Sequence, residues 1–532
     1  MRMGRNPLVI GLLALPCIAA CREGAAAPRA GTREMRAALA DTLIARSARR
    51  DAFSPLKNAQ LGFDPVAAMR AARADVIAAE TETDLFYALA RLSHARRDRH
   101  LDVALVPGGI QLLDSAGLEI RGAAVAAPRR APVRFFPDYS ADSAGYFVGD
   151  VAADERWRDL PAIGSRVVSV NGTPAETWAA QAAAYTRHST RIGLRWHMAQ
   201  SMGLATAAVP SALRGERLQL EVEDANGARS MFTLPYVEEA TLAWSGTGEP
   251  AYPGLAQRLQ TPTYDLLVPE DGRRFLVLLW RGFRETMVAD VDTLMAYADR
   301  QGLLDHAVIL DVTRSRGGSL GPYAMQRLQP RPFRTTFGNL RISDVTGPFI
   351  AGKRDEFAAR SINDGGVAET IDDGSWLMAW LETDVAAALA RGDAYTNAVP
   401  FKLAHASRDS DGVLSPAPLH FRGPFGIICG PQGGSHLDQF VAITVDNGLG
   451  PVVGMPPGGY SNTWEWDEVV TFPGTDQPVI AFMWNIGHTL RPNGEILEGN
   501  PARVDEWIPL TRDNVRGYHA LMLERLLARL GR

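Results

Sequence analysis

Continuous apolar segments alternate with helical ones in the C-terminal half of the chain, and this alternation constrains the fold more than any other feature. Segments 275–280, 307–312 and 425–429 are unbroken apolar runs, which is typical of strands buried on both faces. Segments 288–298 and 437–445 carry apolar residues at helical spacing. Buried strands joined by helices predict a layered α/β domain.

This α/β domain is expected to span residues 265–515. Two short apolar segments, 451–454 and 478–483, are expected to add strands to it. Residues 329–420 show little periodicity and are interpreted as an insertion into the domain.

Two smaller units are expected before the α/β domain. Residues 33–106 form an N-terminal helical domain, in which Asp64-Pro65 and Thr83 each begin a helix, and a strand is expected at 101–106. Residues 130–240 contain short alternating segments and turns, which predict a β-rich module.

The first 20 residues are typical of a bacterial lipoprotein signal peptide. Arg2 and Arg5 precede a short apolar run that ends in Ile18-Ala19-Ala20-Cys21, which resembles a lipobox. We expect Cys21 to be acylated and the protein to be an outer-membrane lipoprotein that faces the periplasm or the cell surface. Residues 21–32 are expected to form a tether. The alternative is an ordinary signal peptide cleaved elsewhere. With a lipoprotein signal, Cys17 leaves with the signal peptide and Cys21 carries the lipid, so only Cys429 remains as a thiol and no disulfide framework is expected.

Composition limits the class of protein. The 532 residues are 46% hydrophobic and 22% charged, as in globular proteins, so a multi-span membrane protein is excluded. The formal net charge of −5 argues against a nucleic-acid partner.

Two glycine-rich turns are candidates for chemistry. Ser435 lies between a predicted buried strand and a helix, where a hydroxyl meets the positive end of a helix dipole. It suits a nucleophile, although on local sequence alone an N-cap serine is the more common reason for such a residue. Gly317-Gly318 follows another strand, where backbone N–H groups could converge on an oxyanion or simply form a tight turn.

Together these segments resemble the C-terminal processing (tail-specific) serine peptidases. Ile309 to Gly318 is similar to that family's Asp-Leu-Arg-x-Asn-x-Gly-Gly segment, and Ser435-His-Leu-Asp438 to its Ser-Ala-x-Glu nucleophile segment. Val452-Val-Gly454 matches the following strand, and 163–172 resembles its PDZ-like turn. The resemblance covers about residues 35–510. It implies a ClpP/crotonase-like layered catalytic domain, with the β-rich module being PDZ-like.

The base distinguishes two branches of that family. In the Ser–Lys branch a lysine lies 25 residues after the serine, and in this chain that position is occupied by Tyr460. No lysine follows Ser435 in the sequence, so a Ser–Lys dyad of this kind is excluded. In the tricorn-core and retinoid-binding-protein-like branch a histidine follows the helical domain, and Asp98-Arg99-His100 resembles its signal. The resemblance implies His100 as the base, with His94 as the rival.

The same resemblance implies a carboxylate near the C-terminus that orients the base. The matched residue is Glu498, and Glu495 and Asp505 are the alternates, although this could also be a solvated acidic loop. Backbone N–H groups of Gly317, Gly318 and His436 are expected to form the oxyanion hole.

Departures from the family pattern affect the residues around the site. Thr313 replaces an arginine, Ser315 an asparagine, Asp438 a glutamate and Arg99 a glycine. The serine that links histidine and glutamate in tricorn-like sites is not found beside His100.

The resemblance implies a serine endopeptidase that acts on peptides or proteins of the cell envelope, without a cofactor. No HExxH or CxxC motif is present, so a metallohydrolase has little support. The alternatives are a non-catalytic relative that binds a peptide or apolar ligand in the same groove, and an envelope scaffold.

Overall fold

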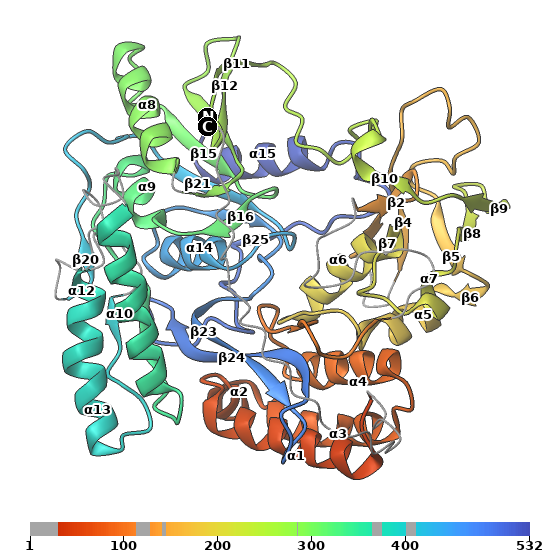
Figure 1. The fold of residues 1–532 in the computed structure, drawn as a ribbon. Helices are drawn as coiled ribbons and strands as arrows, with labels where there is room; N and C mark the ends of the chain where they lie inside the picture. The colour runs from red at the N-terminus through yellow and green to blue at the C-terminus, as the bar shows by residue number, and fades with distance from the viewer. Residues whose placement is uncertain (1–29, 113–127, 141–144, 285, 364–374, 401–410) are drawn as a thin grey trace.

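The computed structural model describes residues 30–112, 128–140, 145–284, 286–363, 375–400 and 411–532. The predicted signal peptide and Cys21 lie outside the described residues. None of the described helices is long and apolar enough to cross a membrane. The chain combines helices and sheets, as the sequence predicts (Figure 1).

Four helices form the N-terminal unit: α1 (Arg33–Arg50), α2 (Ser54–Leu61), α3 (Pro65–Ala78) and α4 (Glu82–His94). Asp64 caps α3 as predicted, since its carboxylate accepts from the amides of Val66 and Ala67. The predicted cap at Thr83 is wrong, because Thr81 caps α4 in a reciprocal capping box with Asp84. Both threonines precede the apolar run, and only the Thr81–Asp84 spacing permits the reciprocal pair.

The end of the expected tether is packed rather than free. Ala30 is buried, and the Gly31 carbonyl accepts from Arg36 at 2.7 Å. Thr32 then caps α1. The chain is therefore anchored against the helical unit from Ala30 onward.

A β-rich unit follows, as predicted. Its largest sheet pairs five strands in the order β3 (Val133–Pro137), β4 (Tyr146–Val151), β5 (Arg166–Val170), β8 (Leu218–Glu223) and β9 (Arg229–Leu234), with β6 (Thr173–Pro174) beside β5. A smaller sheet pairs β10 (Val237–Glu238), β2 (Arg129–Arg130) and β7 (Leu204–Ala205). Helices α5 (Ala175–Ala183) and α6 (Arg191–Met202) pack on this unit around Phe135, Val148 and Trp178.

A seven-stranded sheet forms the centre of the molecule. Its order is β11 (Leu255–Gln260), β12 (Tyr264–Pro269), β13 (Phe275–Trp280), β15 (Ala307–Asp311), β21 (Phe425–Cys429), β22 (Val452–Gly454) and β25 (Glu506–Trp507). The strands from β13 to β25 are parallel, and β11 and β12 add an antiparallel edge.

Helices cover both faces of this sheet, which is why its strands are apolar throughout. On one face lie α8 (Met287–Arg300), α9 (Gly321–Leu328) and α14 (His436–Asp446). On the other face lies α15 (Tyr518–Arg529). The sheet and its helices extend beyond both ends of the expected range 265–515, because β11 begins at Leu255 and α15 ends at Arg529.

A second, antiparallel sheet joins the helical unit to the rest. It pairs β1 (Val103–Ala104), β24 (Pro478–Leu490), β18 (Phe337–Leu340) and β19 (Val399–Pro400), with β23 (Asn462–Thr471) on β24. The strand expected at 478–483 therefore exists, but its place in the α/β sheet was wrong. Its partner β23 forms a hairpin with it, and a hairpin is antiparallel.

The 329–420 insertion contributes to this second sheet. It contains β17 (Phe333–Arg334), β18, α10 (Thr346–Asn363), α12 (Ser375–Trp380), a π-helical segment (Leu381–Val385), α13 (Ala386–Arg391), β19 and β20 (Val413–Leu414). Figure 1 shows α10, α12 and α13 together along one side of the molecule. The stacked rings of Trp380 and Trp464 join this insertion to β23.

Candidate active site

Ser435 lies at the turn between β21 and α14, beyond the carboxyl end of a parallel strand. Its φ of 63° and ψ of −123° place a non-glycine residue in a strained backbone conformation. The Ser435 amide donates to the Tyr460 carbonyl at 2.6 Å, which holds the turn in place. The Ser435 hydroxyl makes no capping hydrogen bond to α14, so the N-cap interpretation does not account for this serine.

The structure brings His100 to Ser435. His100 follows α4 and precedes β1, and its Nε2 lies 3.3 Å from the Ser435 Oγ. The His100 amide donates to Asp98 Oδ1 at 3.0 Å, and the Tyr460 ring packs edge-on against the imidazole with centroids 5.3 Å apart. The rival His94 is buried, and its Nε2 lies 3.3 Å from Asp102 Oδ1. The orientation of the base is thus set by the loop after α4 and by Tyr460.

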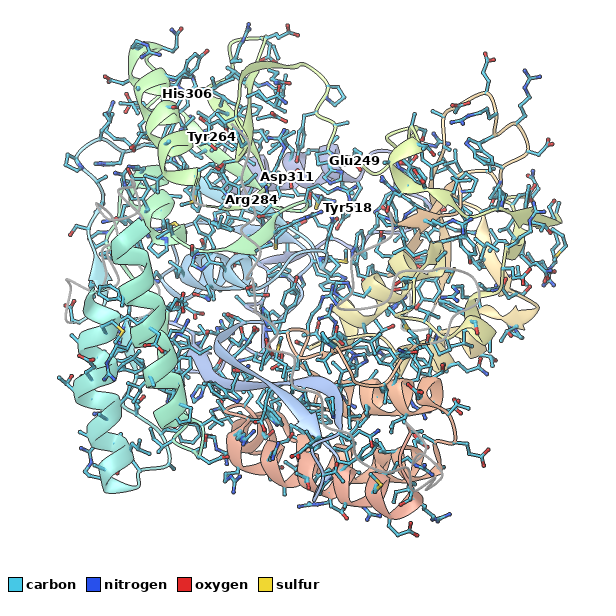
Figure 2. The ribbon with its side chains drawn as sticks, viewed as in Figure 1. Glu249, Tyr264, Arg284, His306, Asp311 and Tyr518 are labelled. Atoms are coloured by element: carbon cyan, nitrogen blue, oxygen red, sulfur yellow. The ribbon has the colours of Figure 1, made fainter. Side chains whose placement is uncertain are left out.

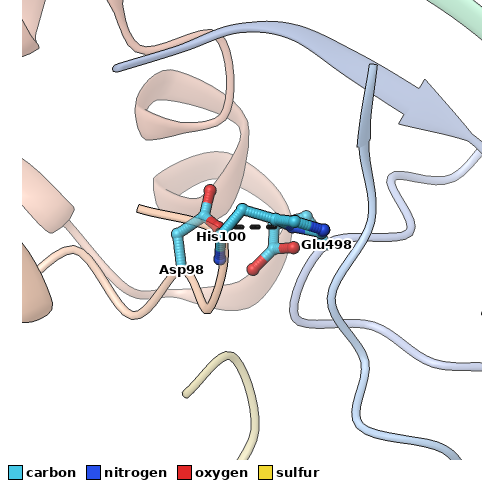
Figure 3. Close-up of side chains that lie close together, drawn as sticks. All are labelled: Asp98, His100 and Glu498. Carbon is cyan, nitrogen blue, oxygen red and sulfur yellow. Dashed lines mark hydrogen bonds and ion pairs between the residues drawn. The ribbon is translucent and has the colours of Figure 1, made fainter. Parts of the chain in front are cut away.

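Two carboxylates lie beside His100 (Figure 3). Ligand atoms of Asp98, His100 and Glu498 all lie within 4.8 Å of one another, and Asp98 Oδ1 is 3.9 Å from His100 Nδ1. Glu498 is completely buried and accepts from the Ser461 amide at 2.8 Å. Glu498, expected from the resemblance, is therefore at the site. The sequence analysis did not identify Asp98 as a second acid.

The alternates to Glu498 are engaged elsewhere. Glu495 is 57% exposed and lies 3.6 Å from Arg491. Asp505 accepts from the Val452 amide at 2.7 Å and so links two strands of the central sheet.

Lys57 lies beneath the two acids and was missed by the sequence analysis. Its side chain is 3% exposed, and its ammonium lies 3.3 Å from Glu498 Oε1 and donates to the Arg97 carbonyl at 2.6 Å. Lysine is rarely buried unless it is paired. No local pattern in α2 marks it, because its partners come from distant parts of the chain.

Ser189 supplies a hydroxyl that the sequence analysis did not find. It accepts from the Arg99 amide at 3.0 Å, and it lies close enough to Glu498 to lower the pKa of that carboxyl. A serine near Glu498 is therefore present. It comes from the segment between α5 and α6 rather than from the residue before the histidine.

The charges of these groups depend on one another. Burial, with the charge of Asp98 added, raises the pKa of Glu498 to about 8, against the opposing effect of Lys57. Burial would also raise the pKa of Asp98, but the charges of Lys57 and His100 hold it below the usual value. One ionised carboxylate, Asp98, is thus stabilised next to the imidazole at neutral pH.

Gly317 and Gly318 lie in β16 (Arg316–Gly318), which pairs with β14 (Gly282–Phe283). A Cβ on Gly317 would lie 2.6 Å from the Ser435 Cβ and 3.0 Å from its Oγ. Gly318 has a φ of 149°, and a Cβ there would lie 1.9 Å from the Phe283 carbonyl oxygen. Only glycine allows this backbone to approach Ser435 and β14 so closely.

His436 has a second role besides its backbone position at the start of α14. Its imidazole is buried against the Phe283 ring, and its Nε2 accepts from the Gly321 amide at 2.7 Å. The side chain therefore fixes α9 and β14 relative to α14.

The departures from the family pattern have structural partners of their own. Asp438 is fully buried, and its two oxygens accept from the amides of Gly459 and Tyr460 at 3.0 and 3.1 Å. Burial raises the pKa of Asp438 to about 8. Thr313 donates its hydroxyl to Asp311 at 2.7 Å. Asp438 thus holds the Tyr460 loop that supports both Ser435 and His100.

The cluster of Asp98, His100 and Glu498 has a donor set that could hold a cation. The Lys57 ammonium already provides positive charge at Glu498, and the imidazole faces a hydroxyl through Nε2. The arrangement therefore fits proton transfer from a serine better than metal binding.

The described geometry defines a mixed α/β protein with a serine–histidine–carboxylate site at the carboxyl edge of its central sheet. A scan against protein-family models finds no match, and no curated protein matches the sequence.

Solved structures resemble the chain over nearly its whole length. The crystal structure of mature CPAF aligns with a TM-score of 0.68 at 15% identity, covering 94% of this chain and 98% of that chain. Mature CPAF complexed with lactacystin aligns with a TM-score of 0.67 at 15% identity, covering 94% and 99%. A photosystem II D1 C-terminal processing protease aligns with a TM-score of only 0.40 at 10% identity, covering 89% and 93%. The chain therefore has the fold of mature CPAF.

Proposed function

We propose that this protein is a serine endopeptidase of the C-terminal processing family, with Ser435 as nucleophile and His100 as base. The observation that carries the proposal is the 3.3 Å separation between the Ser435 Oγ and the His100 Nε2. That distance permits direct proton transfer from the hydroxyl to the imidazole. The CPAF fold and the resemblance of the Ser435 and Gly317-Gly318 segments support the family.

The proposed mechanism follows from the positions of the groups. Ser435 attacks the scissile carbonyl while His100 takes its proton and later returns it to the leaving amine. The ionised Asp98 carboxylate stabilises the imidazolium that forms between these steps, and Glu498 helps to orient the imidazole. The oxyanion of the tetrahedral intermediate would lie beside the Ser435 Oγ, between the backbone of Gly317 and the start of α14. The backbone amides of Gly317, Gly318 and His436 would donate hydrogen bonds to it.

Peptide hydrolysis by purified variants tests the proposal. Ser435→Ala and His100→Ala should each lower kcat by roughly 10³-fold or more, because residues that act as one unit lose their effect together. His94→Ala is the matched control and should retain most of the activity, since His94 contacts Asp102 instead of the nucleophile. If Ser435→Ala hydrolyses peptides at the wild-type rate, the non-catalytic alternative that binds a ligand in the groove becomes the better account.

We also propose that the β-rich unit is PDZ-like and binds extended peptide as an added strand. Support comes from the Val170-Asn171-Gly172 turn between β5 and β6, and from β9, which ends the order of its sheet. The test is binding of labelled peptides to Ser435→Ala protein with free and amidated C-termini. Recognition of chain ends requires that the amidated peptides bind more weakly.

Acylation at Cys21 is proposed on the sequence of the first 20 residues alone, and it would place the enzyme on an envelope membrane with envelope proteins as substrates. Cys21→Ala should release the protein into the soluble fraction, because the lipid is its only proposed anchor. Metabolic labelling with a palmitate analogue checks this directly. A wild-type protein that carries no label would contradict the proposal.

A further inference from the structure

A large cavity opens at the same edge of the central sheet as Ser435. Its volume is about 670 Å³, and residues that follow β13 and β15 line it together with residues of the β-rich unit. The carboxyl ends of parallel strands meet at one edge of a sheet, which is where ligands bind in open α/β folds. Ser435 follows β21, the next strand in that sheet, so the cavity and the nucleophile share this edge.

Two lining residues connect the cavity to the nucleophile. Arg316 directly precedes Gly317, whose backbone touches Ser435. Gln432 lies on the β21–α14 connection that carries Ser435, and its Oε1 accepts from Arg314 at 2.8 Å. A peptide with its scissile bond at Ser435 can therefore place a neighbouring residue in the cavity, since an extended chain advances about 3.3 Å per residue.

The lining is rich in arginine. Six arginines contribute to it: Arg130, Arg134, Arg281, Arg284, Arg314 and Arg316. Figure 2 labels three of the lining residues, Arg284, Asp311 and Glu249.

Carboxylates of the protein neutralise only part of this charge. Glu239 pairs with Arg130 at 2.8 Å, Asp265 pairs with Arg281, and Glu249 lies 3.3 Å from Arg314. Glu249 also lies 3.6 Å from Arg134, and Asp150 lies 3.9 Å from the same arginine, so four of the six arginines have carboxylate partners.

The fourth acid of the lining, Asp311, is turned to other partners. Its oxygens accept from the Tyr252 hydroxyl and from the Thr313 amide and hydroxyl. Within the described part of the chain no carboxylate forms an ion pair with Arg284 or Arg316, and both side chains are exposed. The guanidinium groups of these two lining residues are thus available to a ligand.

We propose that this cavity is a substrate subsite for an acidic side chain, an aspartate or glutamate within about three residues of the scissile bond. The inference rests on the proposed peptidase function and names its substrate class. Guanidinium groups bind carboxylates in bidentate geometry, and the walls formed by Trp280, Phe136 and Leu279 would shelter the pair from water.

Matched peptides test this subsite. A series of fluorogenic peptides carries glutamate or glutamine at one position, from three residues before to three residues after the cleaved bond. At one position the glutamate peptide should have a kcat/KM at least about tenfold higher than its glutamine partner, because a charged hydrogen bond contributes roughly that factor. In the double variant Arg284→Gln/Arg316→Gln, the ratio of kcat/KM between the glutamate and glutamine peptides should fall below about threefold. Arg300→Gln, an exposed arginine on α8 outside the cavity, is the matched control and should leave it unchanged.

Binding to the Ser435→Ala variant separates this inference from the proposed function. The labelled glutamate peptide should bind at least about tenfold tighter than the glutamine peptide even if no peptide is hydrolysed. C-terminal amidation should leave the preference intact. Equal binding of the two peptides, a preference that survives the double arginine substitution, or one that disappears on amidation would overturn the proposal.

Discussion

At the residue scale, the least expected group of the site is Lys57. The resemblance identifies Ser435, His100 and Glu498 by their local segments, but Lys57 has no such segment around it. Its role follows only from the fold, which places α2 beneath Asp98 and Glu498. The charge of Lys57 lowers the pKa of both acids, so it is a positioning residue whose effect reaches His100 through them.

Replacement of Lys57 should therefore move the pH dependence of hydrolysis. In Lys57→Met, both carboxyls keep their protons to higher pH, and the imidazolium loses an ionised neighbour. An imidazolium with less negative charge beside it gives up its proton at lower pH, so the acid limb of the kcat/KM profile should shift downward by on the order of one pH unit. Lys57→Arg should restore most of the wild-type profile, and Lys353→Met, at a half-buried lysine of α10, should not change it. A Lys57→Met enzyme with reduced activity but an unshifted profile would show that Lys57 only stabilises the fold.

At the scale of elements, the parts that could be predicted are those with local signals. The strands at 275–280 and 425–429 and the helix ending at 446 follow from their own apolar patterns. The pairing of segment 478–490 with segment 462–471 does not follow from the apolar pattern of either segment, because both are also compatible with a place in the α/β sheet. Ser189 was missed for the same reason, since it approaches Glu498 from a separate unit.

The close approach of β16 to the α14 turn gives a prediction at this scale. Gly317→Ala should lower kcat by roughly 10²-fold, because the new methyl group would push the oxyanion donors away from Ser435. KM should change by a smaller factor than kcat, and the thermal midpoint of unfolding should stay close to that of the wild type. Gly347→Ala, in α10 with open space around it, is the matched control. Unchanged kcat in Gly317→Ala would remove β16 from the proposed oxyanion site.

At the scale of the whole molecule, several buried groups are held in their neutral forms, and this links stability to pH. Burial lowers the pKa of His488 to about 3 and that of His519 to about 4. Because the folded pKa lies below the unfolded value of about 6.5, the unfolded state binds more protons in between. The contribution of these two histidines to the free energy of unfolding is fully present above pH 6.5. It is lost as the pH falls towards their pKa values in the folded protein.

His488 allows this linkage to be measured. Its ring packs between Phe53 and Tyr395, so His488→Phe keeps an aromatic ring there and removes the titration. Between pH 6.5 and 4 the free energy of unfolding of the wild type should fall relative to the variant by up to about 1.4 kcal/mol per pH unit. Urea unfolding across that range provides the measurement, with His420→Phe as a half-buried comparison. A pH-independent difference between wild type and His488→Phe would show that His488 is not held neutral by the fold.

The central claim is that His100, at 3.3 Å, activates Ser435. The most direct measurement is the rate at which a fluorophosphonate modifies Ser435, followed by mass spectrometry of the intact protein and its peptides. We predict that a single adduct forms on Ser435, that His100→Ala slows its formation at least about 10²-fold, and that His94→Ala leaves it nearly unchanged. Modification of Ser435 at the wild-type rate in His100→Ala, or no adduct on Ser435 in the wild type, would contradict the account.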